Sequence, residues 1–427
     1  MGAIQTVVQA WKIPEMRKKM IYTLVMLIIY RIGSNIPVPF INRELLRSMF
    51  DANNSGLFGL FDLFSGGSFS NFTIFALSIT PYITSSIILQ LLTIAIPALE
   101  NLAKEGEEGR RKIASYTRYI TIVLALIQAV GYTFGLFRNV LTTDSIFAKI
   151  MIVLVLIAGT AFLMWLGEKI DENGVGNGIS LLIFAGIVSR IPTAVSNTVK
   201  GLIAGTYFIP SVLIFCIFAV LVMIGIVLVQ EGTRKIPVQY AKRVVGRKMY
   251  GGQASHLPIK VNQAGVIPVI FATSLLQLPL TFAYMFPSSG FAQWAAKWLS
   301  PSGNPGFWVY FIFDMILIFG FTYFYGSISF NPVEIAENLK SNGGFIPGIR
   351  PGKNTADYIH KVALRLDLVS ACFLAIVSAI PTLMSHWSTL AISFGGTSLI
   401  IAVGVALDTV RSLETQMQMR NYQGFLK

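Results

Sequence analysis

The sequence is poor in charge. Only 12% of its 427 residues are Asp, Glu, Lys or Arg, whereas 54% are hydrophobic, and the mean hydropathy is +0.66. Soluble domains carry about 25% charged residues. The composition therefore excludes an ordinary soluble protein and predicts a chain that crosses a membrane several times.

The residue groups that carry catalysis and metal binding are also scarce. The chain has three histidines and two cysteines, with no CxxC, HExxH or GxSxG pattern and no facing pair of acids inside an apolar segment. We therefore expect no enzymatic activity, no metal site and no cofactor. Cys216 and Cys372 fall inside separate apolar segments, and we expect both to be small core residues.

Apolar windows of about 19 residues predict an all-α polytopic membrane protein with ten transmembrane helices. The spans are placed near Met20–Ile36, Phe72–Pro97, Ser115–Phe137, Phe147–Gly167, Ile179–Val195, Tyr207–Gln230, Gln263–Phe286, Phe307–Phe330, Leu366–Met384 and Leu390–Val410. This divides the chain into an interfacial helix (1–19), helices 1–5 (20–195), an external loop with helix 6 (196–230), a loop (231–261), helices 7–8 (262–330), a second loop (331–365), helices 9–10 (366–411) and a tail (412–427).

Basic residues predict the orientation of the spans. Ten spans put both termini on one side, and that side holds 25 of the 33 lysines and arginines while the other holds eight. Because basic loops stay on the cytoplasmic side, both termini are expected to be cytoplasmic.

The apolar run that leads into the second predicted span is interrupted once and then resumes. Residues 56–64 are largely apolar and aromatic, the run stops at Ser65-Gly66-Gly67-Ser68, and a membrane-length run follows from Phe72. Such a broken element indicates either a water-filled cavity or a loop without function. Thr80, Ser86 and Gln90 make the resumed helix polar, which suits a partner helix or a wet path equally.

The seventh span is also interrupted and polar. It carries Pro268, Pro279, Ser274 and Gln277. It is also the second span in the C-terminal group of five, as the interrupted span above is in the N-terminal group. Corresponding interruptions in two halves favour an inverted repeat with the working path at its interface.

Two basic loops are longer than connections between helices require. Residues 231–261 alternate apolar and basic residues, which predicts a protruding hairpin. Residues 331–365 contain GIRPGK, but Pro347 and Asn354 stand where a phosphate-binding loop needs Gly and Ser or Thr. Docking of a cytoplasmic partner is therefore the expected role of both loops.

Isoleucine and one acid stand out inside the spans. Ile79 and Ile83, and likewise Ile179 and Ile183, are four residues apart and share a helix face. Spacing alone permits a pore lining or lipid-facing stripes. Asp314 is the one acid well inside a span, and it either has a function or reaches water near the span end.

The chain resembles the SecY family, the central subunit of the bacterial protein-translocation channel. The resemblance covers essentially the whole chain and is carried by FSGG with IFALSITPYITSSIILQLL, EGEEGRRKIASYTRY, FLMWLGEKI, GVGNGISLLIFAGIV, YAKRVVGRKMYGGQASHLPIKVNQAGVIPVIFA, FNPVEIAENLKSNGGFIPGIRPGKNTADYI and FGGTSLIIAVGVALD. It implies two pseudo-symmetric, inverted halves of five helices around a central pore, with a short re-entrant plug helix and a gate that opens to lipid between helices 2 and 7.

The resemblance also implies site residues. They are a pore ring of Ile79, Ile83, Ile179, Ile183, Ile270 and Ile401, a plug (57–67) with Leu57, Phe58, Leu60, Phe61, Leu63, Phe64, Gly66 and Gly67, and partner-docking residues Arg243, Arg247, Lys248 and Arg350. The lateral-gate residues Thr80, Ser86, Gln90, Ser274 and Gln277 are inferred from facing positions instead.

The implied function is translocation of unfolded secretory polypeptides across the plasma membrane and sideways release of hydrophobic segments into lipid. The implied partners are the small membrane subunits SecE and SecG, the SecA motor ATPase, a ribosome, a substrate polypeptide with a signal sequence, and membrane lipid. The alternative from the residues is a secondary transporter of a small solute, which predicts paired charges inside the membrane. An intramembrane protease is less favoured, because no nucleophile and base occur within the spans.

Overall fold

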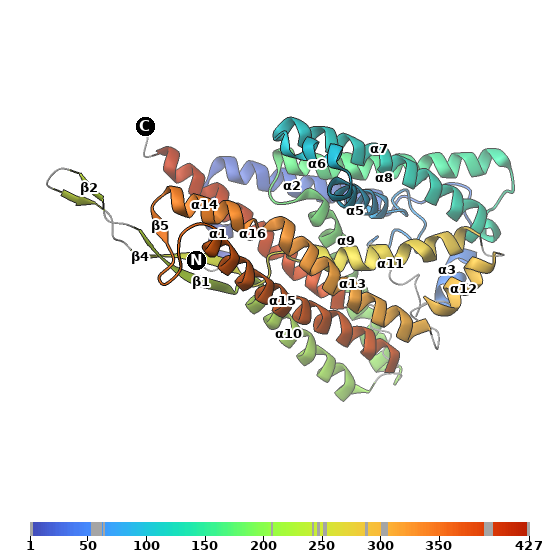
Figure 1. The fold of residues 1–427 in the computed structure, drawn as a ribbon. Coiled ribbons are helices and arrows are strands. Elements are labelled where there is room, and N and C mark those ends of the chain that lie inside the picture. The colour runs from blue at the N-terminus through green and yellow to red at the C-terminus, as the bar shows by residue number, and fades with distance from the viewer. Residues whose placement is uncertain are drawn as a thin grey trace.

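The computed structural model describes residues 3–52, 62, 65–205, 208–240, 243–245, 248–250, 254–286, 289–299, 306–387 and 396–424. Helices dominate the fold (Figure 1). They are α1 (Ala3–Lys12), α2 (Pro14–Gly33), α3 (Arg43–Ala52), α5 (Thr80–Ala95), α6 (Pro97–Lys104), α7 (Glu107–Gly131), η1 (Tyr132–Leu136), η2 (Arg138–Val140), α8 (Ile146–Asn173), α9 (Gly178–Ile203), α10 (Ile209–Glu231), α11 (Ile267–Met285), α12 (Gly290–Trp298), α13 (Gly306–Ser329), α14 (Pro332–Ser341), α15 (Lys353–Trp387) and α16 (Gly396–Gly424).

The fold is mostly helical, as expected, and the two basic loops add strands to it. They are β1 (Thr233–Tyr240), β2 (Arg243–Val245), β3 (Lys248–Tyr250), β4 (Ala254–Lys260) and β5 (Gly344–Phe345). β1 pairs antiparallel with β4 and, on its other edge, with β5. The first loop is therefore a hairpin, as its alternation predicted, and the sheet joins it to the second loop. Ile236 and Val238 of β1 are buried because strand residues two apart share a face.

Six helices of the described residues are long and apolar enough to cross a membrane: Glu107–Leu136, Ile146–Asn173, Gly178–Ile203, Ile209–Glu231, Gly306–Ser341 and the Lys353–Ile380 part of α15. The bent pair of α5 and α6 would make a seventh. The structure thus gives a multi-pass arrangement and fewer qualifying spans than the ten predicted.

The second predicted span is shorter than its apolar run. Its helix begins at Thr80, not at Phe72, and Phe72 and Ser78 adopt positive φ angles of 42° and 54°. Its other end is set by Pro97, because the residue before a proline avoids the helical conformation. Ile96 is accordingly extended, and α6 departs from α5 at 101°.

The helices pack around two main apolar clusters. The larger is built from α2, α5, α8, α9, α10, α11, α13, α15 and α16, and the smaller from the 69–77 turns, α7, η1 and α8. In Figure 1 the helices α2 and α5 to α8 lie together in the upper part, α3 lies at the right beside α12, and α13 and α15 lie in the lower part. α9 and α11 lie between these groups.

Both chain ends lie at the end of the helix bundle that carries the strands (Figure 1). α1 packs there against α2 and α16, where Thr6 donates a hydrogen bond of 2.8 Å to Glu414 Oε1. Val7 faces this contact, whereas Val8 and Trp11 are exposed. The apolar side chains of the predicted interfacial helix are thus divided between the protein and the surroundings.

The two cysteines are not core residues, contrary to the sequence prediction. Cys216 on α10 and Cys372 on α15 are both exposed. A residue inside an apolar span can face either lipid or protein, because both surroundings are apolar. α10 shows this most clearly, since only 11% of its apolar window is buried in the rest of the chain.

Two carboxylates are buried between α13 and α15. Asp314 of α13 is 5% exposed and accepts a hydrogen bond of 3.2 Å from Ser378 of α15, so it does not reach water. Asp367 of α15 is 3% exposed and lies directly against Gly326 of α13. These groups join two neighbouring helices.

Gly326→Ala is expected to lower the melting temperature of the detergent-solubilised protein. A Cβ at Gly326 would lie 2.3 Å from Asp367 Oδ2, so a buried carboxylate would have to move. Overpacking of this kind costs about 1–3 kcal/mol. Gly320→Ala on the same helix is the matched control, because its Cβ would meet nothing within 4 Å. Equal melting temperatures for the two variants would contradict the close contact.

Candidate functional site

Six isoleucines from four separate segments meet in the larger apolar cluster. Ile79, Ile83, Ile183, Ile270 and Ile401 are buried members of that cluster, and Ile179 packs against it. The five buried isoleucines are 0% to 9% exposed. We call these six residues the collar. Lipid-facing stripes, which spacing alone allowed, do not fit this burial.

The collar residues lie near the beginnings of their helices. Ile79 is the residue before α5, Ile179 and Ile183 are in the first turns of α9, and Ile270 is in the first turn of α11. Aliphatic side chains in such a place can shift between rotamers and offer no hydrogen bond to water or ions.

The residues before α5 form a compact turn structure instead of a helix. Phe72 packs edge-on against Phe137, with ring centroids 4.5 Å apart. Val38 N donates to Phe72 O at 3.0 Å, and Ile74 N donates to Ile36 O at 3.0 Å. These contacts hold the non-helical stretch between the end of α2 and η2, and they place Ile79 at the collar.

Most of the predicted plug lies outside the described residues. This applies to Leu57, Phe58, Leu60, Phe61, Leu63 and Phe64. Gly66 and Gly67 are described, and their φ angles of 63° and 90° are conformations that glycine adopts without strain. Asp62, which the sequence did not single out, is 4% exposed.

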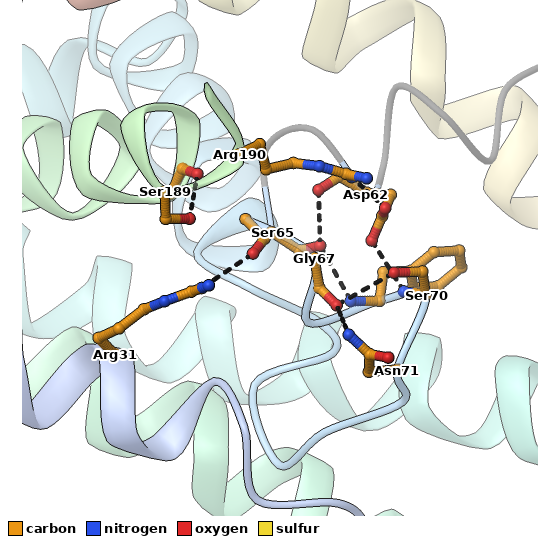
Figure 2. Close-up of polar contacts among 11 residues, drawn as sticks. Arg31, Asp62, Ser65, Gly67, Ser70, Asn71, Ser189 and Arg190 are labelled. Carbon is orange, nitrogen blue, oxygen red and sulfur yellow. Dashed lines mark hydrogen bonds and ion pairs between the residues drawn. The ribbon is translucent and has the colours of Figure 1, made fainter. Parts of the chain in front are cut away.

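Asp62 is the centre of a polar network (Figure 2). Its carboxylate forms an ion pair with Arg190 of α9 and accepts a hydrogen bond of 2.8 Å from Ser70 N. Arg31 of α2 donates to Gly66 O at 3.1 Å. Arg190 was not among the site residues predicted from the sequence. The usable signal was an acid in one apolar segment and an arginine in another.

The predicted gate residues fall into two groups. Ser274 and Gln277 on α11 are buried, whereas Gln90 on α5 is exposed and Thr80 and Ser86 are intermediate. α5 and α11 are in contact. Gln90 Oε1 accepts a hydrogen bond from the Tyr325 hydroxyl of α13, so its partner is not a gate residue of α11.

Other hydroxyls of α5 serve helix packing. Ser85 Oγ lies 2.6 Å from Thr121 Oγ1 and donates to Thr117 O of α7 at 3.2 Å. The Ser85 side of the helix thus faces a partner helix, as one of the two readings expected, whereas Gln90 bonds to α13.

The docking residues lie in the loop region that carries the strands. Arg243 is in β2 and Lys248 is in β3, which form a small hairpin that projects from the bundle (Figure 1). Arg247 lies outside the described residues. Arg350 precedes α15 and its side chain is exposed.

Comparison with known proteins identifies a family that matches this chain. A family model described as SecY matches residues 73–410. The protein translocase subunit SecY of Halalkalibacterium halodurans is 48% identical and covers 99% of this chain and 100% of its own length. The subunit of Bacillus subtilis is 44% identical and covers 99% of both chains. That of Thermotoga maritima is 41% identical and covers 98% of this chain and 96% of its own.

Solved structures show the same fold. One described as a protein-conducting channel has a TM-score of 0.66 at 21% identity and covers 94% of this chain and 92% of its own. Another, described by how the SecY plug domain stabilises the closed channel, has a TM-score of 0.67 at 20% identity with the same coverage. Sec61 from a canine ribosome–channel complex has a TM-score of 0.63 at 19% identity, again with that coverage.

Proposed function

The chain belongs to the SecY family of protein translocase subunits and is therefore part of a protein-translocation channel, not an enzyme; from this premise we propose that the collar is the constriction through which polypeptide passes. The observation that carries the proposal is the meeting of isoleucines from α5, α9, α11 and α16 in one buried cluster. Four segments that contribute side chains to one apolar cluster can move apart around a chain.

The collar would act as a flexible seal. A narrow apolar constriction opposes ion passage by dewetting. A polypeptide can displace aliphatic side chains because no hydrogen bonds need to be broken. The channel thereby combines passage of any sequence with a barrier to small ions.

The proposed channel also has a plug and a lateral gate around the collar. We place ten spans in two inverted halves of five, with the plug of residues 57–67 closing the external side. The gate lies between α5 and α11, which are in contact in this structure. An apolar signal segment would enter lipid between them and gain about 0.8 kcal/mol per buried CH₂. That gain offsets the cost of separating the two helices.

We also propose the location and partners of the channel. The excess of basic residues on one side supports cytoplasmic termini. The similarity to bacterial translocase subunits supports a location in the plasma membrane. The projecting β2–β3 hairpin and the exposed Arg350 suit an acidic surface on the SecA motor ATPase or a ribosome. SecE and SecG are the proposed small membrane subunits, and the substrate is a polypeptide with a signal sequence.

A stalled secretory chain is expected to form a disulfide or cross-link with Ile183→Cys or Ile270→Cys. Cys216 and Cys372 would first be replaced by serine, which their exposure permits. Ile152→Cys on α8 is the matched control, since Ile152 is 0% exposed but belongs to the other cluster. The measurement is adduct formation in membranes with a substrate of defined cysteine position. A solute transporter would give no adduct at any of the three positions.

A further inference from the structure

Asp62 is a buried acid with no part in the seal described above. Both of its carboxylate oxygens are engaged: Oδ1 accepts from Ser70 N at 2.8 Å, and Oδ2 is paired with Arg190 Nη1. Its main-chain oxygen accepts from Gly67 N at 3.1 Å and from Ser65 Oγ at 3.1 Å. One residue therefore organises its own turn and ties that turn to α9 (Figure 2).

Contacts from two helices hold the same turn. Arg31, in the last turn of α2, donates to Gly66 O. Gly66 also lies so close to α9 that an added Cβ would stand 2.7 Å from Gly186 Cα. The turn is thus seated between α2 and α9, with one arginine from each helix.

The place where the turn contacts α9 lies close to the collar. Arg190 follows Ile183 by seven residues on α9, which is about 10 Å along the axis at 1.5 Å per residue. Gly186, against which Gly66 packs, lies between them. A displacement of the turn would therefore take place directly beside the constriction.

We infer that the Asp62–Arg190 ion pair is a latch that keeps the plug seated against α9 and sets how readily the channel opens. The inference rests on the proposed function and adds to it the residues that regulate the plug. Asp62 and Arg190 have side chains 6% and 25% exposed, so the pair is poorly screened by salt while it is closed.

The same chemistry makes the latch reversible. Removing two charges from water costs much of what their attraction contributes, so a buried pair is worth little more than the two hydrated ions. When the turn moves away, Asp62 and Arg190 both regain water. Loss of one partner leaves the other charge unpaired only while the turn stays in place, which favours the displaced turn over the closed one.

A purely structural contact would behave differently from a latch. A structural contact would lower the stability of the protein when broken and leave the closed channel tight. A latch would change ion leak in the absence of substrate while the melting temperature stays near that of the wild type. The two readouts therefore separate the alternatives.

The experiment measures substrate-independent ion leak from vesicles that contain the reconstituted complex. Asp62→Asn and Arg190→Gln are each expected to raise the leak about tenfold, which is the effect of 1.4 kcal/mol. The exchange Asp62→Arg with Arg190→Asp is expected to restore part of the seal, since it recreates an opposite pair. Lys149→Gln is the matched control, because Lys149 also pairs with an acid, Asp144, in a contact that involves no residue of the turn.

Deletion of residues 57–67 separates this inference from the proposed plug. A leak in the deletion variant with tight Asp62→Asn and Arg190→Gln channels would overturn the latch alone. A tight deletion variant would overturn the plug and the latch together. If Asp62→Asn does not assemble, Asp62→Glu, which keeps the charge but lengthens the side chain, is expected to leak less than Arg190→Gln; equal leak would count against the latch.

Discussion

Replacement of Ile183 and Ile270 by serine is expected to make a channel occupied by a stalled polypeptide leak ions more than about tenfold faster than the wild type. Each serine brings a hydroxyl that bonds to water, at about 1 kcal/mol per hydrogen bond. Two hydroxyls would lower the barrier to a hydrated ion by about 2 kcal/mol, and 1.4 kcal/mol corresponds to a factor of ten in rate. The leak is measured as ion-selective current or dye quenching in vesicles.

The occupied channel is the informative state. In the resting channel the proposed plug is a second barrier in series, so a wetted collar alone would change little. With a chain in the pore the plug is displaced, and the collar alone separates the two sides. A leak that appears only with substrate would therefore assign the seal to the collar.

The control variant must lose as much buried apolar packing as the collar variant loses. Truncation of a buried Leu or Ile costs about 2–5 kcal/mol of stability wherever it is made. Ile152→Ser with Leu156→Ser on α8 removes two side chains that are both 0% exposed, in the smaller cluster. The collar pair is 4% and 8% exposed. If the α8 pair leaks as much as the collar pair, the seal is a property of general packing and the collar has no special role.

Composition and periodicity predicted the parts of this fold that depend on local sequence. Low charge and long apolar windows predicted the multi-pass membrane class, and the alternation of Ile236 and Val238 predicted the hairpin of β1 and β4. The family followed from the resemblance and is confirmed by the family model and the curated relatives. The spacing of the isoleucines alone could not decide between pore and lipid, because both are apolar surroundings.

Other features depend on long-range contacts or on backbone geometry. The start of α5 at Thr80 was missed because apolarity does not distinguish a helix from turns such as the one at Ser78, with φ of 54°. Asp62 and Arg190 are 128 residues apart in the chain, so only the fold reveals their pairing. The same holds for the pairing of β5 with β1, because the helices α11 to α14 lie between these two strands in the sequence.

Arg350→Glu is expected to reduce motor-driven translocation by at least about tenfold while the channel remains folded. The main chain at this position is fixed: Thr355 Oγ1 donates to Arg350 O at 2.9 Å, and Gly348 and Gly352 shape the turn with φ angles of 82° and 100°. The guanidinium itself is exposed. A rigid turn with an exposed arginine is preorganised to meet a carboxylate of a partner.

The size of the effect follows from the charge reversal. Loss of one partner of a hydrogen-bonded charge pair at an interface costs about 2–5 kcal/mol, which exceeds the 1.4 kcal/mol of a tenfold change. The measurement is uptake of a secretory protein into vesicles that contain the channel, with the motor ATPase and ATP. Arg350→Lys is expected to fall between the wild type and Arg350→Glu, because lysine keeps the charge but not the two-pronged geometry.

Lys340→Glu makes the same charge change within the same loop region. Lys340 is exposed at the end of α14, and its substitution is expected to have a small effect that disappears as salt is raised. The defect of Arg350→Glu should persist at high salt, because a directly bonded pair is screened less than a distant charge. Equal losses for the two variants, both relieved by salt, would show that the loop attracts its partner only by net charge and that Arg350 makes no specific contact.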